Sequence, residues 1–196
     1  AMKREEFVRF VDVSDRLERH LRAAAVVTSL LADQGTCPVV VGGSALEFYT
    51  RGAYTTMDLD LIVPGLESIA IKLEALGFER TGASFRHPEL PLVIDFPPEP
   101  LAGDPARLTE VDVGPATVRI IGVEDLLADR LRAAVYWHDE ASKEWAVQLL
   151  AAYWQDLDWS YFNRLVEAEG SEVFAAAVRA CRDAAERIRR DAGLGV

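Results

Sequence analysis

Residues 38–63 constrain the fold of this chain more than any other segment. The segment opens with three valines at 39–41, an apolar run short enough for a buried strand. Two glycines and a serine follow at 42–44, and residues 45–49 have helical character. Polar and apolar residues then alternate over 58–61, as they do in a half-buried strand. The pattern predicts a strand, a tight turn, a short helix and a second strand, in that order.

The second strand carries two acids two residues apart. Successive side chains of a strand point to opposite faces, so Asp58 and Asp60 would project together while Leu59 and Leu61 enter the core. Neighbouring carboxylates repel each other and favour a nearby cation. Mg²⁺ suits such a pair, because proteins hold it by one or two carboxylates together with substrate phosphates.

The turn supplies a complementary feature for phosphate. Gly42, Gly43 and Ser44 stand where a strand meets a helix, and backbone N–H groups at a helix start attract anions. Glycine allows a phosphate to approach the backbone closely. The alternatives are a tight turn for the glycines and a simple helix N-cap for Ser44.

These residues resemble the signature of the nucleotidyltransferase superfamily, which includes DNA polymerase beta. In that signature, Gly-Gly or Gly-Ser precedes an Asp-x-Asp or Asp-x-Glu by nine to thirteen residues. Here Gly43-Ser44 is followed by thirteen residues and then by Asp58-Leu-Asp-Leu. The match covers residues 38–150 and is most similar to minimal bacterial nucleotidyltransferases of the abortive-infection toxin type. It implies an α+β fold, with a mixed sheet flanked by helices, an N-terminal helix and a C-terminal helical bundle.

The resemblance also implies further site residues. A third carboxylate on a later strand completes the metal site in the superfamily, and Asp95, between Ile94 and Phe96, matches it. Asp58, Asp60 and Asp95 would then be catalytic and hold Mg²⁺, with Gly42, Gly43, Ser44 and Arg130 binding the nucleotide. The alternatives are a strand-end Asp95 facing water and an exposed ion pair between Asp129 and Arg130. A later acidic position of the toxin group is Val147 here, which is a departure from the family pattern.

The function implied is Mg²⁺-dependent transfer of a nucleoside monophosphate from an NTP to a hydroxyl acceptor. A tRNA 3′ end, a protein hydroxyl and a small molecule such as an aminoglycoside all stay open as acceptors. The toxin-type resemblance favours tRNA or protein and implies an antitoxin partner. The alternative is a non-catalytic module with the same fold that acts as a binding or regulatory partner.

Composition narrows these options. The net charge of −11 over 196 residues argues against a broad non-specific nucleic-acid surface. The sequence contains no run of eighteen apolar residues and shows no signal peptide, so we expect no membrane span. Cys37 and Cys181 lie far apart without metal spacing, which favours a reduced, cytoplasmic protein.

The remaining chain divides into two predicted regions. Residues 1–122 would hold the nucleotidyltransferase core with an N-terminal helical segment, and residues 123–196 a helical region. We expect residues 97–110 to form a surface loop, and His20, which stands between Arg19 and Arg22, to be exposed. Consecutive helices after a set of short strands are typical of an α+β protein.

Overall fold

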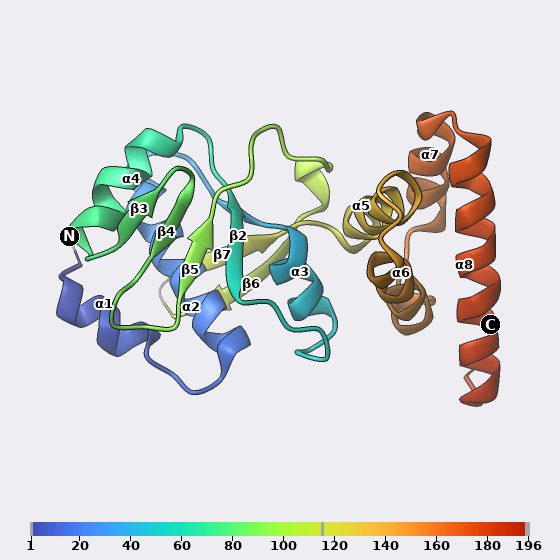
Figure 1. Cartoon of the computed structure of the whole chain (residues 1–196), viewed down its shortest axis with the longest axis horizontal. Helices are drawn as coiled ribbons and strands as arrows, with labels where there is room; N and C mark the ends of the chain where they lie inside the picture. The colour runs from blue at the N-terminus through green and yellow to red at the C-terminus, as the bar shows by residue number, and fades with distance from the viewer. Residues whose placement is uncertain (1, 115, 195–196) are drawn as a thin grey trace. The chain divides into compact units, whose positions relative to one another are not determined.

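The structure is a computed structural model that describes residues 2–114 and 116–194. The chain divides between Ile121 and Gly122 into two compact units. All strands belong to the first unit, and the second unit is helical (Figure 1).

The first unit is built on a seven-stranded sheet. Its strand order is β3-β4-β5-β2-β1-β7-β6. The strands are β1 (Val39–Val40), β2 (Asp58–Ile62), β3 (Glu79–Thr81), β4 (Ser84–Arg86), β5 (Val93–Asp95), β6 (Thr109–Val113) and β7 (Ala116–Ile120).

The sheet is mixed, and its centre is the short strand β1. β1 pairs antiparallel with β2 on one side and parallel with β7 on the other. β2 in turn pairs parallel with β5. The outer pairs β3–β4, β4–β5 and β6–β7 are antiparallel.

Among the described residues, four α-helices and two short 3₁₀ segments complete the first unit. The α-helices are α1 (Arg4–Val11), α2 (Arg16–Leu31), α3 (Gly42–Tyr49) and α4 (Leu66–Ala75); the 3₁₀ segments are η1 (Ala32–Gln34) and η2 (Pro105–Arg107). Asp15 caps α2, because its carboxylate accepts a hydrogen bond from the Glu18 N–H. α2 contacts β2, β6 and β7, and α3 contacts both α2 and β2.

The alternation in β2 sets which side chains enter the core. Leu59 and Leu61 are buried, and so is Ile94 of the neighbouring strand β5. Phe85 and Phe96 pack edge to face with ring centroids 5.5 Å apart. Asp58 and Asp60 take the other face of β2, where both are half-buried.

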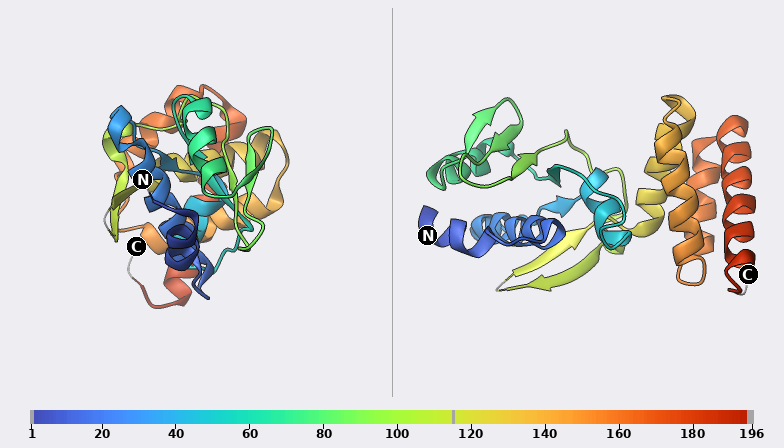
Figure 2. Two further views of the ribbon diagram at one scale, coloured as in Figure 1. Left: turned by 90° about the vertical axis from the view of Figure 1, so that its left-hand side faces the viewer. Right: turned by 60° about the horizontal axis from the view of Figure 1, so that its bottom comes forward.

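The second unit consists of four helices that pack against one another (Figure 2). They are α5 (Val123–Tyr136), α6 (Glu140–Tyr153), α7 (Trp159–Glu169) and α8 (Glu172–Asp191). Asp139, Asp158 and Ser171 cap the last three, and Gly170 ends α7 in a left-handed conformation. No helix in the described residues combines the length and hydropathy of a membrane span.

The predicted α+β class is confirmed, and two local predictions are wrong. Residues 97–110 were expected to be loop, but β6 begins at Thr109. Its residues alternate between half-buried Thr109, Val111 and Val113 and exposed Glu110 and Asp112, which is the pattern of a half-buried strand, but its first two residues are polar and extend the polar loop before it. His20 was expected at the surface, but it is 2% exposed because α2 packs this face against α3.

Candidate active site

The site is built on the end of β2 and the turn that leads into α3. Asp58 and Asp60 lie on the face of β2 opposite its buried leucines. β5 runs parallel to β2, with Asp60 directly beside Asp95 and Asp58 beside Val93. Side chains of directly paired residues point to the same face of a sheet. The structure therefore brings the three predicted carboxylates together on one face.

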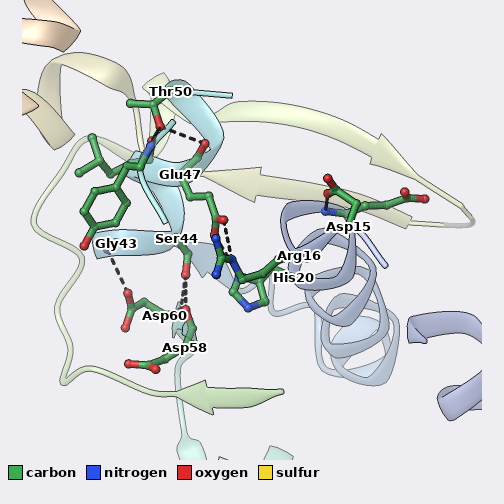
Figure 3. Close-up of polar contacts among 12 residues, drawn as sticks. Asp15, Arg16, His20, Gly43, Ser44, Glu47, Thr50, Asp58 and Asp60 are labelled. Atoms are coloured by element: carbon green, nitrogen blue, oxygen red, sulfur yellow. Dashed lines mark hydrogen bonds and ion pairs between the residues drawn. The ribbon is translucent and has the colours of Figure 1, made fainter. Parts of the chain in front are cut away.

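The Gly42–Gly43 turn lies against the Asp60 carboxylate. The Gly43 N–H donates to Asp60 Oδ2 over 3.0 Å, as Figure 3 shows. Gly42 has φ +56°, and a Cβ there would stand 2.7 Å from Asp60 Oδ2. Glycine at position 42 thus allows both the left-handed backbone and the close approach of this carboxylate.

Gly43 behaves differently from the expectation that its N–H is free for a phosphate. That N–H already has a partner in Asp60. The left-handed φ belongs to Gly42, and a Cβ on Gly43 would meet Thr56 Oγ1 at 3.2 Å. α3 also begins at Gly42 rather than at residue 45, so both glycines lie in its first turn.

Ser44 faces β2 from the first turn of α3. Its hydroxyl donates to the Asp58 carbonyl and accepts from the Asp60 N–H, both over 2.9 Å (Figure 3). The residue is buried. Its side chain therefore touches the backbone of both β2 acids.

Burial raises the pKa of the Asp60 carboxyl to about 6, from an ordinary value of 3.8. Backbone hydrogen bonds from Ser44 and Gly43 lower this pKa, while the charges of Asp58 and Asp95 raise it. The Asp58 and Asp95 carboxylates thus both repel the charge of Asp60, as expected for acids on one face of the sheet.

Asp95 has a buried carboxylate oxygen that lacks a hydrogen-bond donor in the part of the chain that the structure describes. Its Oδ1 is buried and has no hydrogen-bond partner among the described residues. A buried acceptor without a donor is costly, and a cation or a donating ligand would remove that cost.

The donor set fits Mg²⁺ in kind, because all three groups are carboxylates on one face. Within residues 2–114 and 116–194, no three His, Cys, Asp or Glu side chains converge into a ready metal site. The Asp60 carboxylate is instead turned to the Gly43 N–H. Mg²⁺ usually takes only one or two protein carboxylates and completes its shell with water and substrate phosphate, so a closed protein cage is not needed.

Arg130 lies in the second unit, on α5. Its guanidinium pairs with Asp129 Oδ2 over 2.6 Å and also contacts Ser142 Oγ. Asp139, the cap of α6, binds the same Ser142 hydroxyl. The assignment of Arg130 to the nucleotide stays a prediction.

Comparison with solved structures shows which known fold this chain resembles. The chain is similar to an antigenic nucleotidyltransferase-like protein from Paracoccidioides brasiliensis, with a TM-score of 0.54 and 14% identity over 85% of this chain and 94% of that one. The chain has a nucleotidyltransferase-like fold. At this level of identity the likeness extends to the fold alone.

Two structures of ANT(2″)-Ia show a weaker likeness. One is a solution structure of this antibiotic-resistance factor, with a TM-score of 0.42 and 18% identity over 85% of this chain and 90% of that one. The other is its complex with adenylyl-2″-tobramycin, with a TM-score of 0.47 and 17% identity over 79% and 94%. Scores below 0.5 do not establish a shared fold. No family model and no curated protein matches the chain.

The nucleotidyltransferase-like fold also contains a buried polar cluster that the sequence analysis missed. Glu47, one turn beyond Ser44 on α3, accepts from Arg16 Nε over 3.0 Å and lies 3.4 Å from His20 Nδ1 (Figure 3). Glu47 and His20 are both fully buried. The signal available was a glutamate within an otherwise apolar helix, four residues after Gly43.

Proposed function

We propose that this chain is a Mg²⁺-dependent nucleotidyltransferase that moves a nucleoside monophosphate from an NTP to a hydroxyl acceptor. The observation that carries the proposal is the placement of Asp95 beside Asp60 in parallel register, with Asp58 on the same face. The nucleotidyltransferase-like fold supports it by analogy, while the functional argument itself comes from the site.

In the reaction, the acceptor oxygen attacks the α-phosphorus of the NTP. The new bond joins that oxygen to phosphorus, and the bond to the β-phosphate oxygen breaks, so pyrophosphate leaves. Asp58, Asp60 and Asp95 would hold Mg²⁺, which when bound neutralises phosphate charge and favours the ionised form of the acceptor hydroxyl.

Each protein group has a separate role in this proposal. Gly43 orients the Asp60 carboxylate through its N–H, and Gly42 leaves room for that carboxylate. In this proposal Asp95, whose Oδ1 is buried and unpartnered among the described residues, would accept the proton of the acceptor hydroxyl. Positioning and charge neutralisation supply most of the catalysis in phosphoryl transfer.

The acceptor is one of three classes: a tRNA 3′ end, a protein hydroxyl or a small molecule. The test is incubation of each α-labelled NTP with Mg²⁺ and, in separate arms, total tRNA, cell protein and a panel of aminoglycosides. We expect one arm to become labelled by the wild-type protein and to stay unlabelled with Asp58→Asn. Labelling that Asp58→Asn retains in full would contradict the proposal.

A second function, a non-catalytic binding module, is favoured by one observation. The Gly43 N–H and the Ser44 hydroxyl already bind β2, so neither is free for a phosphate. If no arm is labelled while Mg²⁺·NTP still binds with measurable heat, the binding module becomes the better account.

A further inference from the structure

We infer that the Ser44 hydroxyl is a positioning group for the β2 carboxylates and not a ligand of the nucleotide phosphate. The inference rests on the proposed function and adds a residue role to it. In this inference Ser44 binds the protein backbone, whereas the family resemblance implies that it binds the nucleotide.

The Ser44 hydroxyl already uses its single hydrogen in a hydrogen bond within the protein. A serine hydroxyl has one hydrogen, which here goes to the Asp58 carbonyl over 2.9 Å. Its oxygen accepts from the Asp60 N–H over 2.9 Å. A phosphate offers only acceptors at neutral pH, so it would have to displace the Asp58 carbonyl at a residue that is 3% exposed.

The geometry of β2 explains why a side chain is needed there. In a strand, the N–H and C=O groups of alternate residues point to the same edge, so those of Asp58 and Asp60 share one edge. β1 covers only part of that edge. Its residue Val40 pairs with Leu61, and the N–H of the next residue, Val41, donates to the Asp60 carbonyl. Beyond that point the chain turns into α3.

Ser44 therefore continues the hydrogen-bond ladder where β1 ends. One hydroxyl takes the place of the missing strand residue and binds one backbone group from each acidic residue. The segment between them holds Leu59, which is fully buried. Ser44 and Leu59 together fix the backbone from which both carboxylates project.

Removal of the hydroxyl should loosen this backbone without touching the nucleotide. Misplacement of catalytic groups by about 1 Å can reduce rates by about 100-fold. We expect Ser44→Ala to lower kcat about 10- to 100-fold with KM for the NTP within about twofold of wild type. A phosphate ligand would show the opposite pattern, with a raised KM.

The matched control is Tyr49→Phe, at the other end of the same helix. The Tyr49 hydroxyl donates to the Ile121 carbonyl over 2.8 Å and shares a hydrogen bond with Thr109 Oγ1. This variant also removes buried hydrogen bonds from α3 but leaves β2 alone. We expect it to lose stability with kcat unchanged, and Ser44→Thr to restore kcat because it keeps the hydroxyl.

The experiment measures kcat and KM for the NTP, together with hydrogen exchange of the Asp60 amide. We expect this amide to exchange faster in Ser44→Ala alone among the three variants. A raised KM with kcat unchanged, or an Asp60 amide that exchanges as slowly as in wild type, would overturn the inference. If the wild-type protein transfers nothing, the proposed function fails, while the exchange rates still decide whether Ser44 holds β2.

Discussion

At the scale of single residues, Asp60 carries the most distinctive chemistry. Its carboxyl has a pKa of about 6 in the folded protein, against 3.8 ordinarily, mainly because it is buried. The folded state therefore holds a proton more tightly than the unfolded state. Stability contributed by this group is present at low pH and is lost as the pH rises from about 4 to about 6.

We predict that Asp60→Asn stabilises the metal-free protein at pH 8. A rise in pKa from 3.8 to about 6 corresponds to at most about 3 kcal/mol. The asparagine oxygen can still accept the Gly43 N–H, so the hydrogen bond is kept. Urea unfolding should show the gain at pH 8 and little difference at pH 4. Equal stabilisation at both pH values would exclude the carboxylate charge as its cause.

Gly42 is the second residue with a specific constraint. We predict that Gly42→Ala destabilises the protein more than Gly52→Ala, although both glycines have positive φ. A Cβ at Gly42 would stand 2.7 Å from Asp60 Oδ2, while at Gly52 it would meet no described atom within 4 Å. The left-handed conformation alone costs about 1–2 kcal/mol for alanine. Chemical denaturation of both variants measures the excess at Gly42; equal losses would mean that the Asp60 contact is unimportant.

At the scale of elements, several buried polar side-chain atoms lack hydrogen-bond partners among the described residues where α2 packs against α3. Six buried side-chain atoms have no hydrogen-bond partner in the described part of the chain, and four of them lie here. These are Arg19 Nε, both ring nitrogens of His20, and Glu47 Oε2. Burial lowers the pKa of His20, with the charges of Arg16 and Arg19 acting in the same direction and Glu47 opposing them.

The lowered His20 pKa predicts a loss of stability in acid. The unfolded chain takes up a proton near pH 6.5 and the folded chain does so only at a lower pH, so stability falls as the pH drops below 6.5. We expect His20→Gln to flatten this fall between pH 6.5 and 5. His87→Gln is the matched comparison, since burial lowers the pKa of His87 as well. An unchanged pH slope in His20→Gln would show that another group controls the acid limb.

The elements also show which parts of the site the sequence can predict. The alternation of Asp58 to Leu61 correctly placed two acids on one strand face, because the strand period is local. The neighbour relation of Asp60 and Asp95 depends on the pairing of β2 with β5, which no local pattern encodes. It was expected only through the family resemblance. Similarly, Ser44 hydrogen-bonds the β2 backbone because β1 ends before it covers that edge, and this pairing depends on the tertiary structure.

Two other features escaped prediction for physical reasons. β6 opens with two polar residues, Thr109 and Glu110, directly after a loop rich in proline and glycine, so its first residues read as part of that loop. His20 stands between two arginines in the sequence, and its burial follows from the packing of α2 against α3, a tertiary contact that the local sequence does not encode.

At the scale of the whole molecule, the seven-stranded sheet unit holds all three acids. The chain carries a net charge of −11, so an NTP alone would be repelled. A divalent cation held by the proposed carboxylates would offset this repulsion. We therefore expect nucleotide binding and metal binding to be coupled.

Calorimetric titration of an NTP in the presence and absence of Mg²⁺, with wild type and Asp95→Asn, tests this coupling most directly. We predict that wild type binds the NTP only with Mg²⁺, and that Asp95→Asn weakens this binding at least about tenfold while its melting temperature is kept. Equal NTP affinity with and without Mg²⁺, or an unchanged affinity in Asp95→Asn, would contradict the proposal that the three carboxylates form one metal–nucleotide site.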